Sequence, residues 1–280
     1  MTGFRPFPGV LPALAAVALL AGPAAAQSLN FGGAGKGDQP IEIFADNGIE
    51  WQQDNLLFLA HGNARAVRGE VTVFADELRA YYREQKEGGT EIWRLDALGN
   101  VRIKTAQETA YGAHAVYQVD IGVLVLTGGK VRLVTKTDEI TADRQLEYWE
   151  NKQMAVARGN AVAVRENRRL KAEVLAAYFQ PDKNKAGENK LYRVDAFDNV
   201  TIVTEQDTAT ADRGVYNVDS GIATLTGSVK LTRGDNVLTG CKAVVNMNSN
   251  ISNLYSCPGT GKGPRERARG TLIPKTAKGQ

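Results

Sequence analysis

Apolar and polar residues alternate along most of the chain, over residues 41–254. In runs such as Val101–Ile103 and Val200–Ile202, apolar side chains project to one face and charged or hydroxyl side chains to the other. This period of two predicts half-buried β-strands. No stretch shows a convincing 3.6-residue apolar period. Residues 172–179 resemble a short helix, but their place in the repeat described next predicts a strand.

Two short phrases recur along the chain, with 29–39 residues between successive copies of either one. The first is a small residue followed by a polar one, usually Ala-Asp, which closes a β-like run. The second is a Gly-Asn-like pair, which we expect to form a turn that opens a β-like run. The first phrase stands at Ala45-Asp46, Ala75-Asp76, Gly112-Ala113, Ala142-Asp143, Ala172-Glu173, Ala211-Asp212 and Gly240-Cys241, and the second at Gly62-Asn63, Gly99-Asn100, Gly128-Gly129, Gly159-Asn160, Asp198-Asn199 and Gly227-Ser228. Such a period indicates stacked units, none of which buries its apolar face alone.

A longer repeat of 99 residues spans three of these units. Leu95–Ala97 matches Val194–Ala196, and Ala115–Tyr117 matches Gly214–Tyr216 at the same offset. Two polar inserts, around residues 82–93 and 181–192, account for the two longest steps of the short repeat. We expect both inserts to project as loops from the same side of the stack.

The apolar face of each strand must be covered by a second sheet or by a ligand, because no helices are predicted. The fold class is therefore all-β, an open stacked roll of two sheets. Inward positions after the Gly-Asn pairs are often small, as at Ala64, Ala66, Ala161 and Ala163. Small inward residues are compatible either with a groove between the sheets or with tight sheet packing, and the sequence favours neither.

The first 26 residues have the features of a secretory signal peptide: Arg5, the apolar run Val10–Leu20 and the small residues Ala24–Ala26. An uncleaved anchor is the alternative, but the run is short for a membrane span. The rest is predicted to comprise a flexible segment (27–39), one β domain (40–257) and a basic, flexible tail (258–280).

The charge of the chain is nearly balanced, with 34 basic and 31 acidic residues and a net charge of +3. Loss of the signal peptide removes one basic residue and leaves +2. The basic excess lies mainly in the last twenty residues. The body is therefore not predicted to bind nucleic acid, and the tail is either a solvated end or a contact to lipid phosphates or an anionic membrane surface.

Candidate chemistry is sparse. The only two cysteines, Cys241 and Cys257, are expected to form a disulfide after secretion, with free thiols as the alternative. The histidines, His61 and His114, belong to no catalytic or metal-binding motif. The recurring aspartates are interpreted as turn or strand-end acids rather than a calcium ladder. No enzyme activity, cofactor or metal is predicted.

Several short motifs follow one another in a fixed order. They are Asp38–Ile43, an Ala-Asp pair, Gly62–Ala64, Ala75-Asp76 and the stretch from Tyr117 through Val125–Gly128. In this order they resemble the LptA/OstA-like family of periplasmic lipopolysaccharide-transport proteins. The resemblance covers roughly residues 38–250. It implies a β-jellyroll in the periplasm that holds lipopolysaccharide acyl chains between its sheets. It also implies end-to-end contacts with jellyroll domains of LptC-like inner-membrane and LptD-like outer-membrane partners, or with further copies of itself.

A lipid-binding groove follows from this resemblance and from the alternation. The resemblance indicates Ile41, Ile43, Tyr117 and Val119 as lining residues. Inward positions of the repeat add Val73, Val101, Ile103, Val131, Leu133, Ile140, Leu170, Val200 and Ile202. Two other classes compete: a structural or adhesive β-solenoid without lipid cargo, and a carbohydrate-active enzyme on a β-helix, for which no carboxylate cluster is evident.

Overall fold

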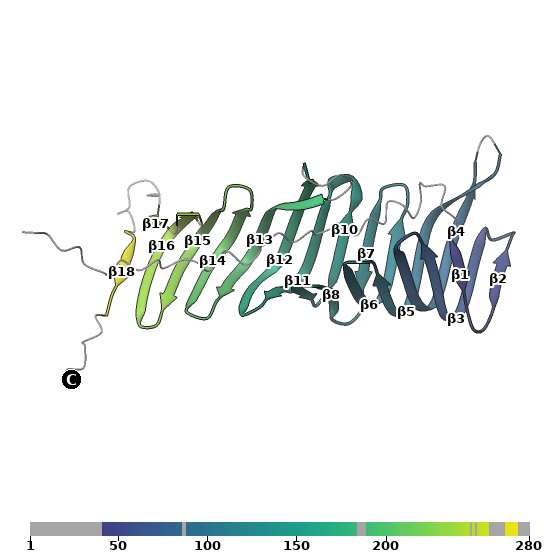
Figure 1. The fold of residues 1–280 in the computed structure, drawn as a ribbon, viewed down its shortest axis with the longest axis horizontal. Coiled ribbons are helices and arrows are strands. Elements are labelled where there is room, and N and C mark those ends of the chain that lie inside the picture. Colours follow the sequence, from purple (N-terminus) through teal and green to yellow (C-terminus); the bar gives the residue numbers. More distant parts are fainter. Residues whose placement is uncertain are drawn as a thin grey trace, which may run out of the picture.

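The computed structural model describes residues 41–85, 88–183, 189–246, 248–249, 251–257 and 267–273, which form an elongated all-β roll (Figure 1). The predicted signal peptide and the whole of the predicted flexible segment lie outside these residues. The elements are β1 (Glu42–Phe44), β2 (Ile49–Gln52), β3 (Leu57–Arg68), β4 (Val71–Glu84), β5 (Thr90–Lys104), β6 (Glu108–Gln118), β7 (Val123–Thr127), β8 (Val131–Thr135), β9 (Asp138–Ala142), β10 (Gln145–Trp149), the 3₁₀ turn η2 (Glu150–Lys152), β11 (Met154–Arg165), β12 (Arg168–Pro181), β13 (Asn189–Val203), β14 (Asp207–Asn217), β15 (Ile222–Arg233), β16 (Asn236–Asn246), β17 (Ile251–Tyr255) and β18 (Arg269–Thr271).

All strands belong to one antiparallel sheet that folds into two facing walls. The short strands β2, β7, β10 and β17 belong to the first wall, and β1, β8, β9 and β18 belong to the second. The long strands β3–β6 and β11–β16 pass through both walls. The predicted all-β jellyroll is confirmed, with one bent sheet in place of two separate ones.

The Gly-Asn pairs lie inside long strands, so the prediction that they open a strand was wrong. In β3, the pairing with β4 runs from Leu57 to His61 and resumes at Ala64. Between these stretches Gly62 and Asn63 adopt φ values of 78° and 43°. Two successive residues with positive φ bend the strand into the other wall, as a β-bulge does. Only Gly128-Gly129 separates two strands, β7 and β8.

Aspartates of the first phrase lie beside these corners and hold them. The side-chain amides of Asn63, Asn100 and Asn160 donate hydrogen bonds to the carboxylates of Asp46, Asp76 and Asp143, at 2.8, 2.9 and 3.0 Å. Asp212 accepts a hydrogen bond from the backbone N–H of Ser228 at 3.1 Å. The two recurring sequence pairs therefore act together: an acid from one pair accepts a hydrogen bond from the left-handed corner of the neighbouring strand.

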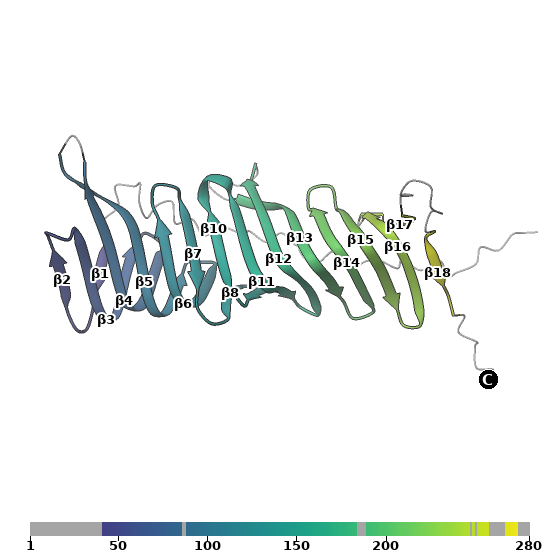
Figure 2. The ribbon, with the colours of Figure 1, turned by 180° about the vertical axis from the view of Figure 1, so that it is seen from behind.

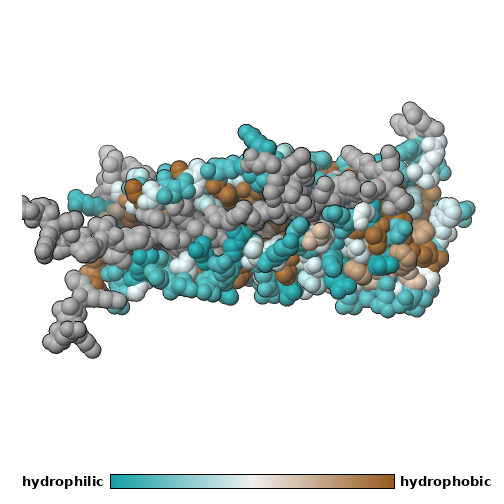
Figure 3. Space-filling model, in the orientation of Figure 1, coloured by the Kyte–Doolittle hydropathy of each residue, from teal (hydrophilic) through white to brown (hydrophobic). Residues whose placement is uncertain are grey.

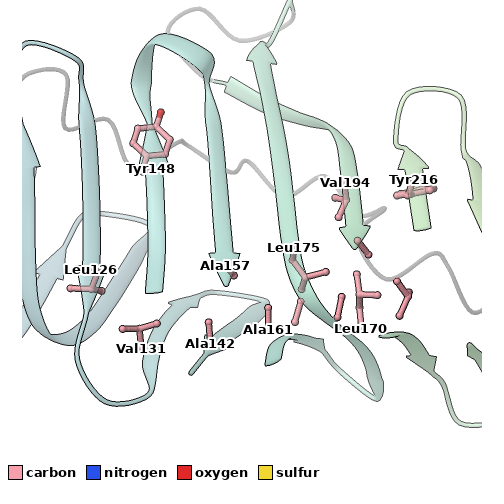
Figure 4. Packing of buried hydrophobic residues seen from close by; sticks show 14 of the residues in the cluster. Leu126, Val131, Ala142, Tyr148, Ala157, Ala161, Leu170, Leu175, Val194 and Tyr216 are labelled. Atoms are coloured by element: carbon pink, nitrogen blue, oxygen red, sulfur yellow. The ribbon is translucent and has the colours of Figure 1, made fainter. Parts of the chain in front are cut away.

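The core lies between the walls and runs from Ala75 to Val245. Leu126 and Ala157 of the first wall lie near Val131 and Ala142 of the second, which are fully buried (Figure 4). Residues 172–179 are part of β12, so the strand predicted there is confirmed. Within the described residues, no helix is long and apolar enough to span a membrane.

The polar inserts project from the same long edge of the roll, as predicted (Figure 1). They are mostly extended hairpin ends rather than loops, since β4 reaches Glu84 and β12 reaches Pro181. Part of the predicted flexible tail is also a strand: Arg269–Thr271 forms β18 and pairs with β16. The rest of that tail lies outside the described residues, apart from residues 267–268 and 272–273.

The two ends of the roll are open. Among the described strands, β1 and β2 pair only with β3, and β17 and β18 pair only with β16, at the opposite ends seen in Figures 1 and 2. Near the last strands, Cys241 of β16 and Cys257 are joined in a disulfide with a Cα–Cα distance of 4.8 Å. It ties the segment after β17 to the corner of β16.

Candidate functional site

A cavity of about 930 Å³ lies between the walls in the N-terminal half of the roll. Its walls come from β1, β3, β4, β5, β6 and β7. Period-two alternation turns one side chain in two toward this space. Apolar side chains also gather on the surface at this end of the molecule (Figure 3).

The structure brings six of the thirteen predicted groove residues to this cavity. Four of them are inward side chains of strands, one precedes β1 and one follows β6: Ile41, Ile43, Val73, Ile103, Tyr117 and Val119. Ile43 is half-buried, whereas its neighbours Glu42 and Phe44 point the other way and are exposed. In β1 Ile43 therefore faces the cavity and its two neighbours face away from it, as the alternation predicts.

The other seven predicted residues point inward but do not line the cavity. Val101, Val131, Leu170, Val200 and Ile202 are buried in the core, and Leu133 and Ile140 pack against it. Val131 is 0% exposed and Ile202 is 2% exposed. Both belong to the core between the walls, which continues through the C-terminal half.

Several lining residues were not predicted, and they come mainly from the first wall. They are the larger side chains Phe58, Leu78, Tyr82, Ile92, Leu95 and Leu124 and the small ones Ala60, Ala66, Ala80, Ala97 and Ala115. The same period of two was available on these strand halves. Our prediction chose lining residues mostly from the strand halves after the Gly-Asn pairs. Those halves mostly belong to the second wall, so the lining residues of the first wall were missed.

Polar and charged residues also line the cavity. The end of β3 and the β3–β4 turn contribute Arg68 and Glu70, and the extended β4–β5 hairpin contributes Glu91. Arg83 of that hairpin donates two hydrogen bonds to the carboxylate of Asp120, at 2.7 and 2.8 Å. It donates a third to Glu91, at 2.6 Å, which lowers the pKa of that carboxyl. These contacts tie the hairpin to the turn between β6 and β7.

The phenol of Tyr117 is the main polar group deep in the site. It donates to the carboxylate of Glu150, with O–O distances of 3.1 Å to both oxygens. Burial and the neighbouring Glu150 carboxylate raise the pKa of Tyr117, so the phenol stays neutral. The site therefore presents a mainly apolar lining in which Glu150 orients the hydroxyl of Tyr117.

The 99-residue repeat pairs an acid in the N-terminal half of the roll with one in the C-terminal half, and the two have different partners on the second wall. In the C-terminal half, Asp207 lies opposite Arg233 on β15 and forms a two-pronged ion pair with it at 2.5 Å. In the N-terminal half, the matching Glu108 lies opposite Thr135. Its Oε1 atom is buried without a hydrogen-bond partner in the described structure, and burial raises the pKa of Glu108 to about 8.

The arrangement has the features of a binding site for an apolar ligand. Among the described residues, no group of three or more His, Cys, Asp or Glu side chains could hold a metal ion. A partly open, mainly apolar cavity of this size, lined by a few polar and charged side chains, is typical of ligand-binding sites.

Comparison with known proteins identifies the family. The family described as "LptA/(LptD N-terminal domain) LPS transport protein" matches residues 42–145 and 139–251. The chain therefore belongs to this family of lipopolysaccharide-transport proteins, whose role is non-enzymatic.

A solved structure with similarity to the chain is LptH, described as the LptA homologous periplasmic component of the conserved lipopolysaccharide transport device from Pseudomonas aeruginosa. The two share 13% identity over 85% of this chain and 97% of LptH, with a TM-score of 0.22. This score is too low to support any argument. No curated protein sequence matches the chain.

Proposed function

We propose that this protein binds lipopolysaccharide in the periplasm and relays it from the inner-membrane transporter toward the outer-membrane translocon. The acyl chains would lie in the cavity between the walls, and the sugar head group would remain in water at its charged mouth. The observation that supports this most is the apolar cavity in a chain that belongs to the lipopolysaccharide-transport family.

The physics of the cargo requires such a shelter. Each Å² of apolar surface removed from water contributes about 25 cal/mol, so a lipid with several acyl chains crosses an aqueous space only at high cost. Inward residues such as Ile43, Val73 and Ile103 offer the apolar contacts that replace lipid neighbours. Movement between binding sites needs no catalytic group, in keeping with the non-enzymatic family.

The open ends provide a route for assembly into a bridge. Unpaired strand edges at β1 and β2 and at β17 and β18 accept a further strand from a partner, as in β-augmentation. Large apolar side chains are exposed at both ends, with Trp51 at 66% and Leu272 at 68%. We infer end-to-end docking with LptC-like and LptD-like jellyroll domains, or with further copies of this chain.

The remaining features fit secretion. We propose that residues 1–26 are a cleaved signal peptide and that the mature chain works in the oxidising periplasm. Such a compartment favours the bond between Cys241 and Cys257. The disulfide would then preserve the C-terminal edge as a docking surface, because it holds the segment after β17 on β16.

Site-specific photo-crosslinking in cells tests the proposal. A photoreactive residue at Ile43 faces the cavity, and the same residue at the adjacent Glu42 faces solvent. We expect lipopolysaccharide adducts at Ile43, Ile103 and Tyr117 but not at Glu42. Absence of lipopolysaccharide adducts at all three inward positions in a folded protein would refute lipid carriage and favour a structural β-solenoid.

A further inference from the structure

One row of outward side chains crosses the second wall from end to end. Pairing between neighbouring strands connects Phe44, Arg65, Phe74, Arg102, Tyr111 and Arg132 in succession. It continues through Thr141, Val162, Lys171, Thr201, Thr210, Lys230, Thr239 and Arg269. We call these fourteen residues the basic row. It contains six cations and no acid, in a chain whose acids nearly equal its bases.

The first six members of the basic row alternate aromatic and arginine side chains. The guanidinium of Arg65 lies 4.1 Å from the ring centre of Phe44, that of Arg102 lies 4.2 Å from Phe74, and that of Arg132 lies 4.9 Å from Tyr111. Stacking on a ring fixes the plane of a guanidinium and leaves its N–H edges free to donate.

Arginines on the first wall are used differently. There, three buried outward carboxylates, Asp96, Glu147 and Asp195, each receive a hydrogen bond from an arginine at 2.5–2.6 Å. In the basic row, only Arg132 has an ion pair with a described acid, Glu139, at 3.7 Å. The positive charge of the first wall is therefore neutralised locally, and that of the basic row mostly is not.

The neighbouring acids of the second wall do not neutralise the arginines of the basic row. Glu42 lies two residues from Phe44 on the exposed edge strand. The corner acids Asp46 and Asp76 accept hydrogen bonds from Asn63 and Asn100. None of these carboxylates has an ion pair with Arg65 or Arg102 within the described structure.

We propose that the aromatic-arginine part of the basic row binds the phosphate groups of the lipopolysaccharide head group. Arginines two strands apart are separated by about 9–10 Å, a spacing at which one phosphorylated oligosaccharide contacts two of them. Each guanidinium offers two parallel N–H donors to a phosphate, and the rings between them offer faces to sugars. This inference rests on the proposed function.

The position of the row relative to the cavity permits this contact. Arg68, at the end of β3, and Gly69 and Glu70 in the turn that follows line the cavity, and Arg65 precedes them on β3. The intervening three to five residues span about 10–16 Å of extended backbone. A head group whose acyl chains lie in the cavity therefore reaches Arg65 by passing over the edge of the second wall at the β3–β4 turn.

Acyl-free, phosphorylated core oligosaccharide, titrated calorimetrically into the mature protein, tests the proposal without involving the cavity. We expect saturable binding that weakens as salt rises from 20 to 200 mM. Replacing both arginines with glutamine (Arg65→Gln with Arg102→Gln) should reduce affinity by about tenfold or more, because charge-assisted hydrogen bonds are lost. Dephosphorylating the oligosaccharide should have a similar effect.

The matched control is Arg213→Gln. Arg213 also lies over an aromatic ring, Phe197 at 4.7 Å, but on the first wall. This variant should bind within twofold of the wild type. A second pair, Arg65→Lys with Arg102→Lys, keeps the charge and removes the planar fork, and should bind with intermediate affinity. Far-ultraviolet circular dichroism confirms that each variant is folded.

Equal binding of phosphorylated and dephosphorylated oligosaccharide would overturn the proposal, as would unchanged affinity in the double glutamine variant. Binding of anionic phospholipid vesicles without binding of the oligosaccharide would assign the row to a membrane surface and equally overturn it. Crosslinking at Ile43 reports on the cavity separately. Loss of that signal with intact oligosaccharide binding would reject the proposed lipid carriage alone.

Discussion

The buried carboxyl of Glu108 makes the stability of this protein depend on pH in a defined direction. The repeat places Glu108 where Asp207 stands 99 residues later, but Thr135 occupies the position opposite Glu108 that Arg233 occupies opposite Asp207. With burial as the cause, the pKa of Glu108 rises from 4.5 to about 8. We predict that Glu108→Gln stabilises the fold above neutral pH.

The sign and size follow from proton linkage. Because the folded-state pKa lies above the unfolded value, the folded chain binds this proton more tightly. The resulting stability is fully present below about pH 4.5 and is lost as the pH rises through about 8. A shift of 3.5 units, 8 minus 4.5, corresponds to about 5 kcal/mol. The amide of the variant lacks a partner, as the neutral carboxyl does, so this cost of about 1–3 kcal/mol is common to both proteins. The net gain expected at pH 8.5 is therefore about 4–5 kcal/mol.

Urea unfolding of the mature protein at pH 5, 6, 7, 8 and 8.5 measures this effect. The free energy of unfolding should fall more steeply with pH in the wild type than in Glu108→Gln, and the two curves should diverge above pH 5. Glu139→Gln is the control, since Glu139 is half exposed on the outer face of the same wall. Parallel curves for wild type and Glu108→Gln would show that the carboxyl is solvated and refute the reasoning.

Two further pairs of substitutions test the cavity and the corners. Ala66→Leu should leave the urea midpoint nearly unchanged because Ala66 borders the cavity, whereas Ala163→Leu, 97 residues later and 8% exposed, should destabilise by about 1–3 kcal/mol through overpacking. Equal losses would indicate that the cavity is closed in solution. Gly99→Ala should cost at least about 1 kcal/mol, because φ is 75° and the new methyl group meets the Asp76 carboxylate. Gly129→Ala, with φ at 67° and open space around it, should cost less, and urea unfolding of both variants decides.

The sequence predicts the strands and their inward faces well because burial enforces a period of two. Residues such as Val101 and Ile202 were placed inside from that period alone, and both are buried. The corners were misread. Gly62-Asn63 has the composition of a turn, but the positive φ values serve a bend that keeps one strand in both walls.

The extent of the cavity depends on a difference that periodicity does not register. Ala66 and Ala163 occupy equivalent positions, yet Ala66 lines the cavity and Ala163, which is 8% exposed, belongs to the core. This difference depends on packing between residues that are far apart in sequence. Of the two alternatives raised by the small inward residues, a groove is present at Ala66 and sheet packing at Ala163.

The 99-residue repeat also sets a unit of length. From β5 to its counterpart β13 the sheet advances by six strands in either wall. Six strand spacings amount to about 29 Å. Gain or loss of one such block through gene duplication or deletion would change the reach of the roll by this increment and leave both terminal edges intact. A block of 99 residues thus sets the length of the roll separately from the edges at its two ends.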